Sequence, residues 1–397
     1  MRRVEVLNGN QAAAVAAKLC RPEVIAAYPI TPQTPIVEYL TQFVADGELD
    51  ASLSEVESEH SALSVLQGAS LAGCRTFTAT SSQGLALMYE PYFRTSTLRL
   101  PIVMVIVNRE MISPQTVWGG PQDALTVRDA GWIQIYVEDN QEILDTVIQA
   151  YRIAEDPRVL LPVNVCFDGF YLSHMTERVE VPSQAEVDAY LPPGYRPEHI
   201  YLDPERPMSV DPLTPGDLLT EYRRRHMEAM ARAAEVIREA DEGFGRRFGR
   251  RWGGLVDTYR LEDAEHVLVT MGSMTGAARE AVDEARARGI PVGLLKIRAL
   301  RPFPASEVRE ALAGRKSFGV VDRNVSFGWG TGIVFQEVCA ALYGAGEVIP
   351  GVPFIGGLGG EDLTVELMGR AIENVAQVAG KPGGTPEATW LIGRWGR

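Results

Sequence analysis

Short apolar runs alternate with longer amphipathic stretches along most of the chain. An apolar run bounded by turn residues predicts a buried strand, whereas apolar positions three or four residues apart predict a helix. In the first half, the predicted strands are residues 24–28, 53–57, 75–80, 100–107, 132–137 and 159–167, and the predicted helices are residues 11–19, 36–45, 60–72, 85–93 and 141–154. Strands and helices that alternate with short links predict a doubly wound parallel sheet.

The same alternation returns near the C-terminal end. The predicted strands there are residues 266–271, 292–297, 317–321 and 353–355, and the predicted helices are residues 275–288, 305–313 and 332–343, with a last helix after the glycine-rich residues 356–362. Between the two halves, the proline-rich residues 176–215 predict an arm that runs over the surface or onto a partner, and residues 217–248 have the 3.6-residue period of a long helix. We therefore predict an α/β protein with two doubly wound domains, residues 1–175 and 261–397, which residues 176–260 connect.

Composition and charge narrow the class of protein. A chain of 397 residues with 46% hydrophobic content can bury a large core. A formal net charge of −14 argues against binding to nucleic acid or to an anionic membrane. No apolar run approaches the length of a membrane span, and residues 1–5 lack the hydrophobic core of a signal peptide. We expect a cytoplasmic protein with no membrane partner.

Metal and nucleotide motifs are missing from the sequence. Its four cysteines are far apart and form no Cys-x-x-Cys pair, and its five histidines lack metal-ligand spacing, so we expect no metal site in this chain. The short glycine patterns at residues 328–330 and 357–359 lack the third glycine of a dinucleotide fingerprint. A nucleotide-binding α/β protein is therefore a weaker hypothesis.

Polar groups follow four of the predicted strands in the first half. Residues 28–35 form a loop that three prolines make stiff, because each proline fixes φ and lacks an N–H. The carboxyl ends of parallel strands meet at one edge of a sheet, so we expect the four groups to converge. Taken singly, the carboxylate would be a helix N-terminal residue, the arginine a surface ion pair, and the Gln-Gly pair a turn. The four groups are Thr31, Glu59, Gln83 with Gly84, and Arg109.

Specific motifs occur at these strand ends and in the second half. Those of the first half are Tyr28-Pro29-Ile30-Thr31-Pro32, Glu57-Ser58-Glu59-His60, Ser82-Gln83-Gly84, Asn108-Arg109, Asp168-Gly169-Phe170 and Ser173-His174. Those of the second half are Arg301-Pro302-Phe303-Pro304, Asp322-Arg323-Asn324-Val325-Ser326-Phe327-Gly328 and Gly357-Leu358-Gly359-Gly360. With them the sequence resembles the pyruvate:ferredoxin oxidoreductases, the thiamine-diphosphate-dependent 2-oxoacid oxidoreductases, over nearly the whole chain. The resemblance implies the separate alpha subunit of a multi-subunit member, with a thiamine-diphosphate pyrimidine-binding-type domain and a transketolase C-terminal-like domain.

The resemblance also implies roles for individual residues. Glu59 would hydrogen-bond to N1′ of the cofactor's aminopyrimidine, which a carboxyl group suits because it can exchange a proton there. Thr31 would contact the carbonyl or the reacting carbon of the substrate. Arg109 would pair with the 2-oxoacid carboxylate, a task for its planar guanidinium. The remaining expected cofactor contacts are Pro29, Ile30, Gln83 and Gly84.

The implied reaction needs groups that this chain lacks. It is the oxidative decarboxylation of a 2-oxoacid to acyl-CoA and CO2, with coenzyme A as co-substrate and electrons leaving through [4Fe-4S] clusters. The family's Gly-Asp-Gly motif for diphosphate and Mg²⁺ is absent here, as are the cluster cysteines. We therefore expect a beta subunit that holds the diphosphate and Mg²⁺, gamma and ferredoxin-like delta subunits, and an external ferredoxin or other acceptor.

The substrate and two other hypotheses stay open. Residues 110–123 follow the pyruvate-type loop only loosely, so an aromatic or branched 2-oxoacid such as phenylglyoxylate is an alternative to the expected pyruvate. The neutral Thr31 disfavours a dicarboxylate. A scaffold subunit that kept the fold without the chemistry is another hypothesis. Gly272-Ser273, before a predicted helix, could hold an anion such as part of coenzyme A, although a plain turn is the better interpretation.

Overall fold

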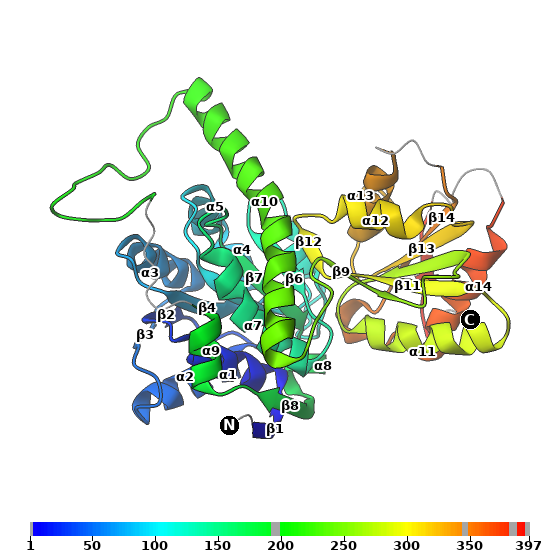
Figure 1. Cartoon of the computed structure of the whole chain (residues 1–397), viewed down its shortest axis with the longest axis horizontal. Coiled ribbons are helices and arrows are strands. Elements are labelled where there is room, and N and C mark those ends of the chain that lie inside the picture. The colour runs from blue at the N-terminus through cyan, green and yellow to red at the C-terminus, as the bar shows by residue number, and fades with distance from the viewer. Residues whose placement is uncertain (1–2, 192–198, 344–347, 381–386, 394–397) are drawn as a thin grey trace.

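The computed structural model describes residues 3–191, 199–343, 348–380 and 387–393, and it consists of two lobes (Figure 1). The first lobe contains a seven-stranded sheet in the order β12-β6-β7-β5-β4-β2-β3. Its strands are β2 (Val24–Ala27), β3 (Ser52–Glu55), β4 (Thr76–Thr80), β5 (Val103–Asn108), β6 (Ile133–Tyr136), β7 (Val163–Asp168) and β12 (Ala299–Arg301). All neighbours are parallel except β12, which runs antiparallel to β6.

Helices cover both faces of this sheet. The side chains of β5 alternate: Val103 and Val105 belong to one apolar core and Met104 and Ile106 to the other, and all are fully buried. Because successive side chains of a strand point to opposite faces, an apolar run such as β5 requires cover on both. The helices are α1 (Gly9–Cys20), α2 (Thr34–Ala45), α3 (Glu59–Leu71), α4 (Ser82–Leu87), α5 (Tyr89–Thr97), α6 (Gln122–Thr126), α7 (Asn140–Ala154) and α8 (Tyr171–His174). The predicted doubly wound sheet is confirmed, although residues 85–93 belong to two helices instead of one.

The second lobe has the same architecture. Its six-stranded sheet has the order β15-β14-β13-β10-β11-β9, with only β9 antiparallel to its neighbour. The strands are β9 (Val256–Tyr259), β10 (His266–Thr270), β11 (Val292–Ile297), β13 (Ser317–Asp322), β14 (Gly351–Gly356) and β15 (Thr389–Leu391). The helices are α11 (Met274–Ala287), α12 (Ala305–Leu312), α13 (Ile333–Tyr343), α14 (Val365–Gln377) and the short η1 (Leu358–Gly360).

The predicted irregular arm is partly wrong. Its first part forms β8 (Thr176–Val181), which pairs with β1 (Arg3–Asn8), and then α9 (Gln184–Tyr190), whose Val187 is fully buried. No apolar period is visible in the sequence here because each of the two elements buries only two residues. The later part, residues 199–215, is an irregular arm whose loop projects from the molecule (Figure 1), although Ile200 and Val210 pack against the core; residues 192–198 lie outside the described residues. The predicted long helix is α10 (Gly216–Phe248).

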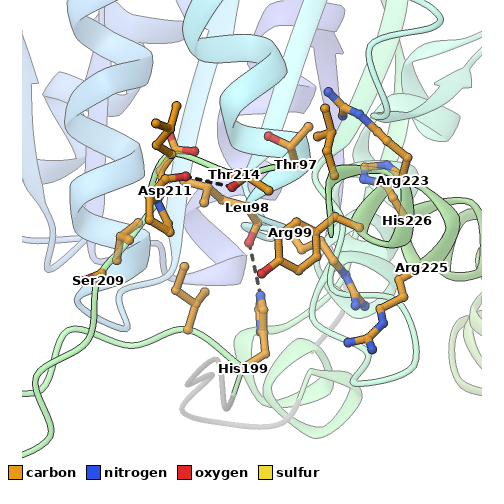
Figure 2. Close-up of a pocket in the computed structure, with 16 residues that line it drawn as sticks. Thr97, Leu98, Arg99, His199, Ser209, Asp211, Thr214, Arg223, Arg225 and His226 are labelled. Atoms are coloured by element: carbon orange, nitrogen blue, oxygen red, sulfur yellow. Dashed lines mark hydrogen bonds between the residues drawn. The ribbon is translucent and has the colours of Figure 1, made fainter. Parts of the chain in front are cut away.

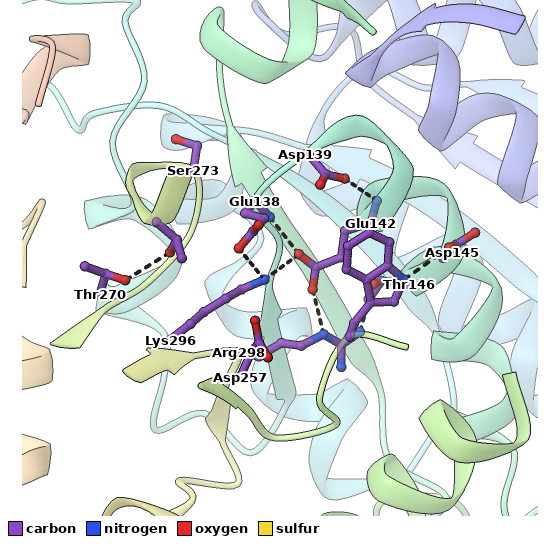
Figure 3. A network of polar contacts seen from close by, with 12 residues as sticks. Glu138, Asp139, Glu142, Asp145, Thr146, Asp257, Thr270, Ser273, Lys296 and Arg298 are labelled. Carbon is purple, nitrogen blue, oxygen red and sulfur yellow. Dashed lines mark hydrogen bonds and ion pairs between the residues drawn. The ribbon is translucent and has the colours of Figure 1, made fainter. Parts of the chain in front are cut away.

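A buried polar network joins the two lobes (Figure 3). Lys296 Nζ lies 2.7 Å from a Glu142 carboxylate oxygen and 2.9 Å from Glu138, and Arg298 Nε lies 2.7 Å from Glu142. Lys296 and Arg298 come from the second lobe, whereas Glu142 belongs to α7 of the first. Because buried charges must be paired, this network fixes how the lobes meet.

Candidate active site

Arg109 and Thr31 meet at the carboxyl edge of the first sheet. Thr31 follows β2, and Arg109 follows β5. Arg109 Nη1 donates a hydrogen bond of 3.0 Å to the Thr31 carbonyl oxygen, and its Nε donates one of 3.1 Å to the Thr116 carbonyl oxygen. The hydroxyl of Thr31 is not used in this contact, and the residue is exposed. The ends of β2 and β5 therefore meet, as the sequence predicts, through the Arg109 side chain and the backbone carbonyl of Thr31.

The guanidinium of Arg109 is buried without a counter-ion. Only 8% of the residue is exposed. Within the described residues, no carboxylate lies within ion-pair distance of its side chain, and burial lowers the pKa of the guanidinium. The surface ion pair considered from the sequence is therefore wrong. A buried cation that neutral carbonyls orient is a strong attractor for an anionic ligand.

Glu59 begins α3 at the same edge of the sheet. Ser58 caps this helix, its Oγ accepting a hydrogen bond from the Ser61 N–H, so Glu59 occupies the first helical turn as the simpler interpretation also predicts. The side chain is buried, and in the described part of the chain no other residue donates a hydrogen bond to its carboxylate. Burial raises the pKa of this carboxyl group. A buried acid without a partner is a candidate for binding a ligand or exchanging a proton.

Gly84 provides the space for that carboxylate. A Cβ atom on Gly84 would lie 2.5 Å from Glu59 Oε1 and 2.6 Å from Thr80 Oγ1. Both Thr80 Oγ1 and Gln83 Oε1 are buried and have no hydrogen-bond partner. Residues 83 and 84 lie in the first turn of α4, so they are not the isolated turn considered from the sequence. Unsatisfied polar atoms around Glu59 fit a ligand that carries its own donors, as an aminopyrimidine does.

The proline-rich loop holds Thr31 rigidly. Asn10 Nδ2 donates a hydrogen bond of 3.0 Å to the Pro32 carbonyl oxygen, and the Ile30 N–H donates one of 3.2 Å to Gln33 Oε1. Pro29 and Ile30 are half-buried. Within the described residues, no hydrogen bond connects this loop to Glu59. The candidate site at this sheet edge therefore has two parts. One consists of Thr31 and Arg109, and the other of Glu59 and Gly84.

Asp123 holds together the strand ends at this edge of the sheet. The sequence did not single it out. Its fully buried carboxylate accepts hydrogen bonds from the backbone N–H groups of Ser82 at 2.9 Å and Arg109 at 3.1 Å, and from Asn108 Nδ2 at 2.8 Å. Burial raises the pKa of this carboxyl to about 6. It ties the ends of β4 and β5 together. The only sequence signal was its place in the Gly-, Pro- and Gln-rich residues 110–127.

Residues of the second lobe complete this region. Arg323 forms an ion pair with Asp168 at 2.8 Å, and the Ser273 hydroxyl also donates a hydrogen bond to Asp168. Because the Ser273 N–H donates to Asp168 as well, at 3.3 Å, the donors considered for an external anion are already engaged. The N–H of Gly359 donates a hydrogen bond of 3.4 Å to Glu110, another acid that sequence reasoning missed.

A separate groove lies at the end of α5 (Figure 2). It has a volume of about 800 Å³ and lies between the start of α10, the arm of residues 199–215, and the segment that leads into the amino end of β5. Its lining includes the cationic side chains of Arg99, Arg223 and Arg225. Since the candidate residues stand at the carboxyl ends of the strands, this groove belongs to the opposite edge.

The described residues contain neither a cluster of metal ligands nor a membrane-spanning helix. No group of three or more His, Cys, Asp or Glu side chains in that part of the chain is arranged to hold a metal ion. Among the same residues, every helix is too short or too polar to cross a bilayer. The four cysteines are free thiols, with Cys20 and Cys166 buried.

Comparisons with known proteins agree with this architecture. The thiamine-diphosphate-binding domain of pyruvate flavodoxin/ferredoxin oxidoreductases matches residues 15–242, and core domain II of pyruvate:ferredoxin oxidoreductase matches residues 264–368. The alpha subunit of the NADH-dependent phenylglyoxylate dehydrogenase of Aromatoleum evansii is 48% identical over 396 residues, 98% of this chain and 95% of that protein. Pyruvate synthase subunit PorA of Methanocaldococcus jannaschii is 49% identical over 376 residues, 94% of this chain and 95% of that protein.

A solved structure shows the same fold. The 2-oxoglutarate:ferredoxin oxidoreductase of Magnetococcus marinus superimposes with a TM-score of 0.73 at 22% identity, covering 94% of this chain and 65% of that one. Both lobes thus have counterparts in one family, in the same order along the chain. With identities near one half over almost the full length of two alpha-type subunits, this chain belongs to the pyruvate:ferredoxin oxidoreductase family.

Proposed function

We propose that this chain is the alpha subunit of a 2-oxoacid oxidoreductase complex and that it binds the aminopyrimidine of thiamine diphosphate and the 2-oxoacid. One observation carries the proposal. A buried carboxylate without a partner, Glu59, packs against Gly84 at the sheet edge where Arg109 is buried without a counter-ion. A scaffold subunit that had lost the chemistry would have no reason to bury an acid and a guanidinium that both lack a direct ionic partner.

Glu59 is proposed to hold a proton at the pyrimidine ring nitrogen. When bound, thiamine diphosphate supplies the electron sink that decarboxylation of a 2-oxoacid requires. Since burial raises the pKa of Glu59, its carboxyl exchanges a proton closer to neutral pH than an exposed glutamate would. Gln83 and Gly84 would hold the ring against it, with Pro29 and Ile30 on the other side.

Arg109 is proposed to orient the substrate carboxylate. Carbonyl groups hold its Nε and Nη1, so the remaining terminal nitrogen is presented in a fixed direction. An anion that binds there gains a charge-assisted hydrogen bond with little loss of side-chain entropy. The hydroxyl of Thr31, in the loop that follows β2, would donate a hydrogen bond to the 2-oxo group of the substrate.

Pyruvate is the proposed substrate, and an aromatic 2-oxoacid is the second candidate. Relatives with either activity are nearly equally similar to this chain. One feature favours the aromatic acid. The rings of Trp118 and Phe170 lie 4.7 Å apart, and Trp118 is 53% exposed on the loop whose Thr116 carbonyl holds Arg109. Comparing kcat/KM for pyruvate and phenylglyoxylate on the purified complex distinguishes the two.

The site needs partner subunits, because this chain supplies only the pyrimidine side. Tyr28, Leu87 and Tyr89 are each at least 40% exposed on the loop and helices that start at the site, and they offer an apolar surface to a neighbour. We propose a beta subunit here that carries the diphosphate site with Mg²⁺, with [4Fe-4S] clusters on it and on a ferredoxin-like delta subunit. A gamma subunit, coenzyme A and an external ferredoxin complete the proposed reaction.

The free thiols agree with a reducing compartment, the cytoplasm.

Glu59→Gln tests this function in the assembled complex. The amide keeps the shape and can form a hydrogen bond, but it cannot exchange the proton, so we expect turnover to fall by about 10²- to 10⁴-fold while the subunits stay associated. Glu55→Gln, an exposed residue at the end of β3, is the matched control and should leave turnover unchanged. If the Glu59 variant turned over at the wild-type rate, Glu59 would have no catalytic role and the scaffold hypothesis would gain support.

A further inference from the structure

We propose that Glu110 is a positioning residue that clamps the substrate-binding Arg109 loop to the glycine-rich turn of the second lobe. The inference deepens the proposed function and rests on the role of Arg109 given there. Glu110 does not face the ligand, since its side chain points toward Gly120 and Gly359 while that of Arg109 points toward Thr31. It therefore acts through its neighbour.

The clamp has one attachment in each lobe. The Gly359 N–H donates a hydrogen bond of 3.4 Å to Glu110 Oε1 from the second lobe. On the side of the first lobe, a Cβ atom on Gly120 would collide with the same carboxylate oxygen. Gly359 has φ near +61°, a conformation that a side chain would strain. The carboxyl group thus sits between two glycine-containing segments: the lack of a side chain at Gly120 leaves room for it, and the backbone conformation of Gly359 presents the N–H to it.

The main chain of Glu110 connects this clamp to Arg109. Its N–H donates a hydrogen bond of 3.1 Å to the Trp118 carbonyl oxygen, and its own carbonyl accepts one of 2.8 Å from Ser82 Oγ. These bonds close the loop of residues 110–118, and the carbonyl of Thr116 in this loop holds Arg109 Nε. If Glu110 shifts, the groups that aim the guanidinium shift with it.

The second lobe holds its end of the clamp rigidly. Arg323 Nε donates a hydrogen bond of 3.3 Å to the Gly357 carbonyl oxygen, and the same guanidinium is paired with Asp168 of the first lobe. The turn that carries Gly359 is therefore fixed to both lobes. This gives the second lobe a direct influence on the substrate site.

The charge of Glu110 changes within the working pH range. Burial, aided by the negative Asp123 and opposed by the Gly359 N–H and Arg323, raises the pKa of its carboxyl to about 7. Above this pH, the carboxylate is ionised and accepts a stronger, charge-assisted hydrogen bond from the Gly359 N–H, which tightens the clamp. We expect the KM of the wild-type complex for its 2-oxoacid to decrease as the pH rises through about 7.

Two variants of Glu110 test the clamp in the assembled complex. Glu110→Ala removes the acceptor and should raise KM by about tenfold with a smaller effect on kcat. Glu110→Gln keeps an acceptor for Gly359 but cannot ionise, so it should recover most of that loss and should give a KM that is independent of pH between 6 and 8. Glu90→Gln, at an exposed carboxylate on α5, is the control and should retain the wild-type pH dependence.

A double-mutant cycle with Arg109→Ala separates this inference from the proposed function. If Glu110 acts through Arg109, the Glu110→Ala change should leave KM unaltered once Arg109 is gone. A wild-type KM for Arg109→Ala alone would refute the role of Arg109 in the proposed function, and with it this inference. An unchanged KM for Glu110→Ala, or the same increase in both backgrounds, would overturn the clamp while the proposed function stands. Should Glu110→Ala not assemble, Gly120→Ala, which displaces the carboxylate, must raise KM instead.

Discussion

At the scale of single residues, the site depends on where side chains are absent as much as on where they are present. Glu59 can be buried at the start of α3 because Gly84 leaves room for its carboxylate. Gly84 has no left-handed backbone conformation, so the need for glycine here comes from space alone. The raised pKa of Glu59 follows from the same close packing, which excludes water.

Gly84→Ala should disable the site without unfolding the chain. The new methyl group would lie 2.5 Å from Glu59 Oε1 and displace the carboxylate, so we expect turnover of the complex to fall by about a hundredfold. Titration of the complex with thiamine diphosphate should show weaker binding. Gly68→Ala is the matched control, since a Cβ there meets no atom within 4 Å and alanine favours the interior of α3. Wild-type turnover for Gly84→Ala would mean that the carboxylate does not need its present position.

At the scale of elements, α7 of the first lobe meets β11 of the second lobe through buried charged side chains. Glu142 of α7 faces Lys296 of β11 and Arg298 just after it, and all three are at most 1% exposed. Thr146, one turn along α7, accepts a further hydrogen bond of 2.9 Å from Arg298. Such a network disfavours any other alignment of the two elements, because a shift would leave a buried charge unpaired.

Glu142→Gln should therefore destabilise the fold strongly. The amide leaves Arg298 without a counter-ion in the described structure, and the expected loss in the free energy of unfolding is about 3–5 kcal/mol. Urea denaturation monitored by circular dichroism measures it. Glu48→Gln, which removes the charge of a half-exposed carboxylate paired with Lys18, should cost no more than about 1 kcal/mol. Equal losses for the two variants would show that the buried network contributes nothing special.

At the scale of the whole molecule, several buried acids oppose the folded state at high pH. Burial raises the pKa of Asp123 and Asp322 to about 6 and that of Glu110 and Asp139 to about 7. The folded chain therefore holds these protons more tightly than the unfolded chain, whose carboxyl groups titrate near pH 4. Their contribution to stability is full below that pH and is lost as the pH rises through their folded pKa values.

The complex should accordingly unfold more easily at pH 8 than at pH 5.5. Each tenfold difference in proton affinity corresponds to about 1.4 kcal/mol, so the four groups together should lower the urea midpoint measurably. Asp322→Asn, whose amide remains close to the N–H groups of Val334 and Phe335, should reduce the pH dependence. A urea midpoint that increased between pH 5.5 and pH 8 would contradict the prediction.

Local patterns in the sequence predicted the central strands and most helices of both lobes, although not β8, α9 or β12. Strands such as β5 and helices such as α7 were predictable because their period of apolar positions is a local property of the chain. The positions of Thr31, Glu59 and Arg109 after successive strands followed from the same pattern, and family motifs added their roles. Those roles stay predictions until variants are measured.

Which distant segments meet could not be predicted locally, because it depends on how the whole chain packs. β12 joins the first sheet although it lies more than 160 residues after its partner β6, because the chain returns from the second lobe to the free edge. Glu110 meets Gly359 across 249 residues, and Lys296 meets Glu142 across 154. A sequence pattern reports whether a residue is buried, but the partner that neutralises a buried charge is set by packing, and for Lys296 and Arg298 that partner comes from the other lobe.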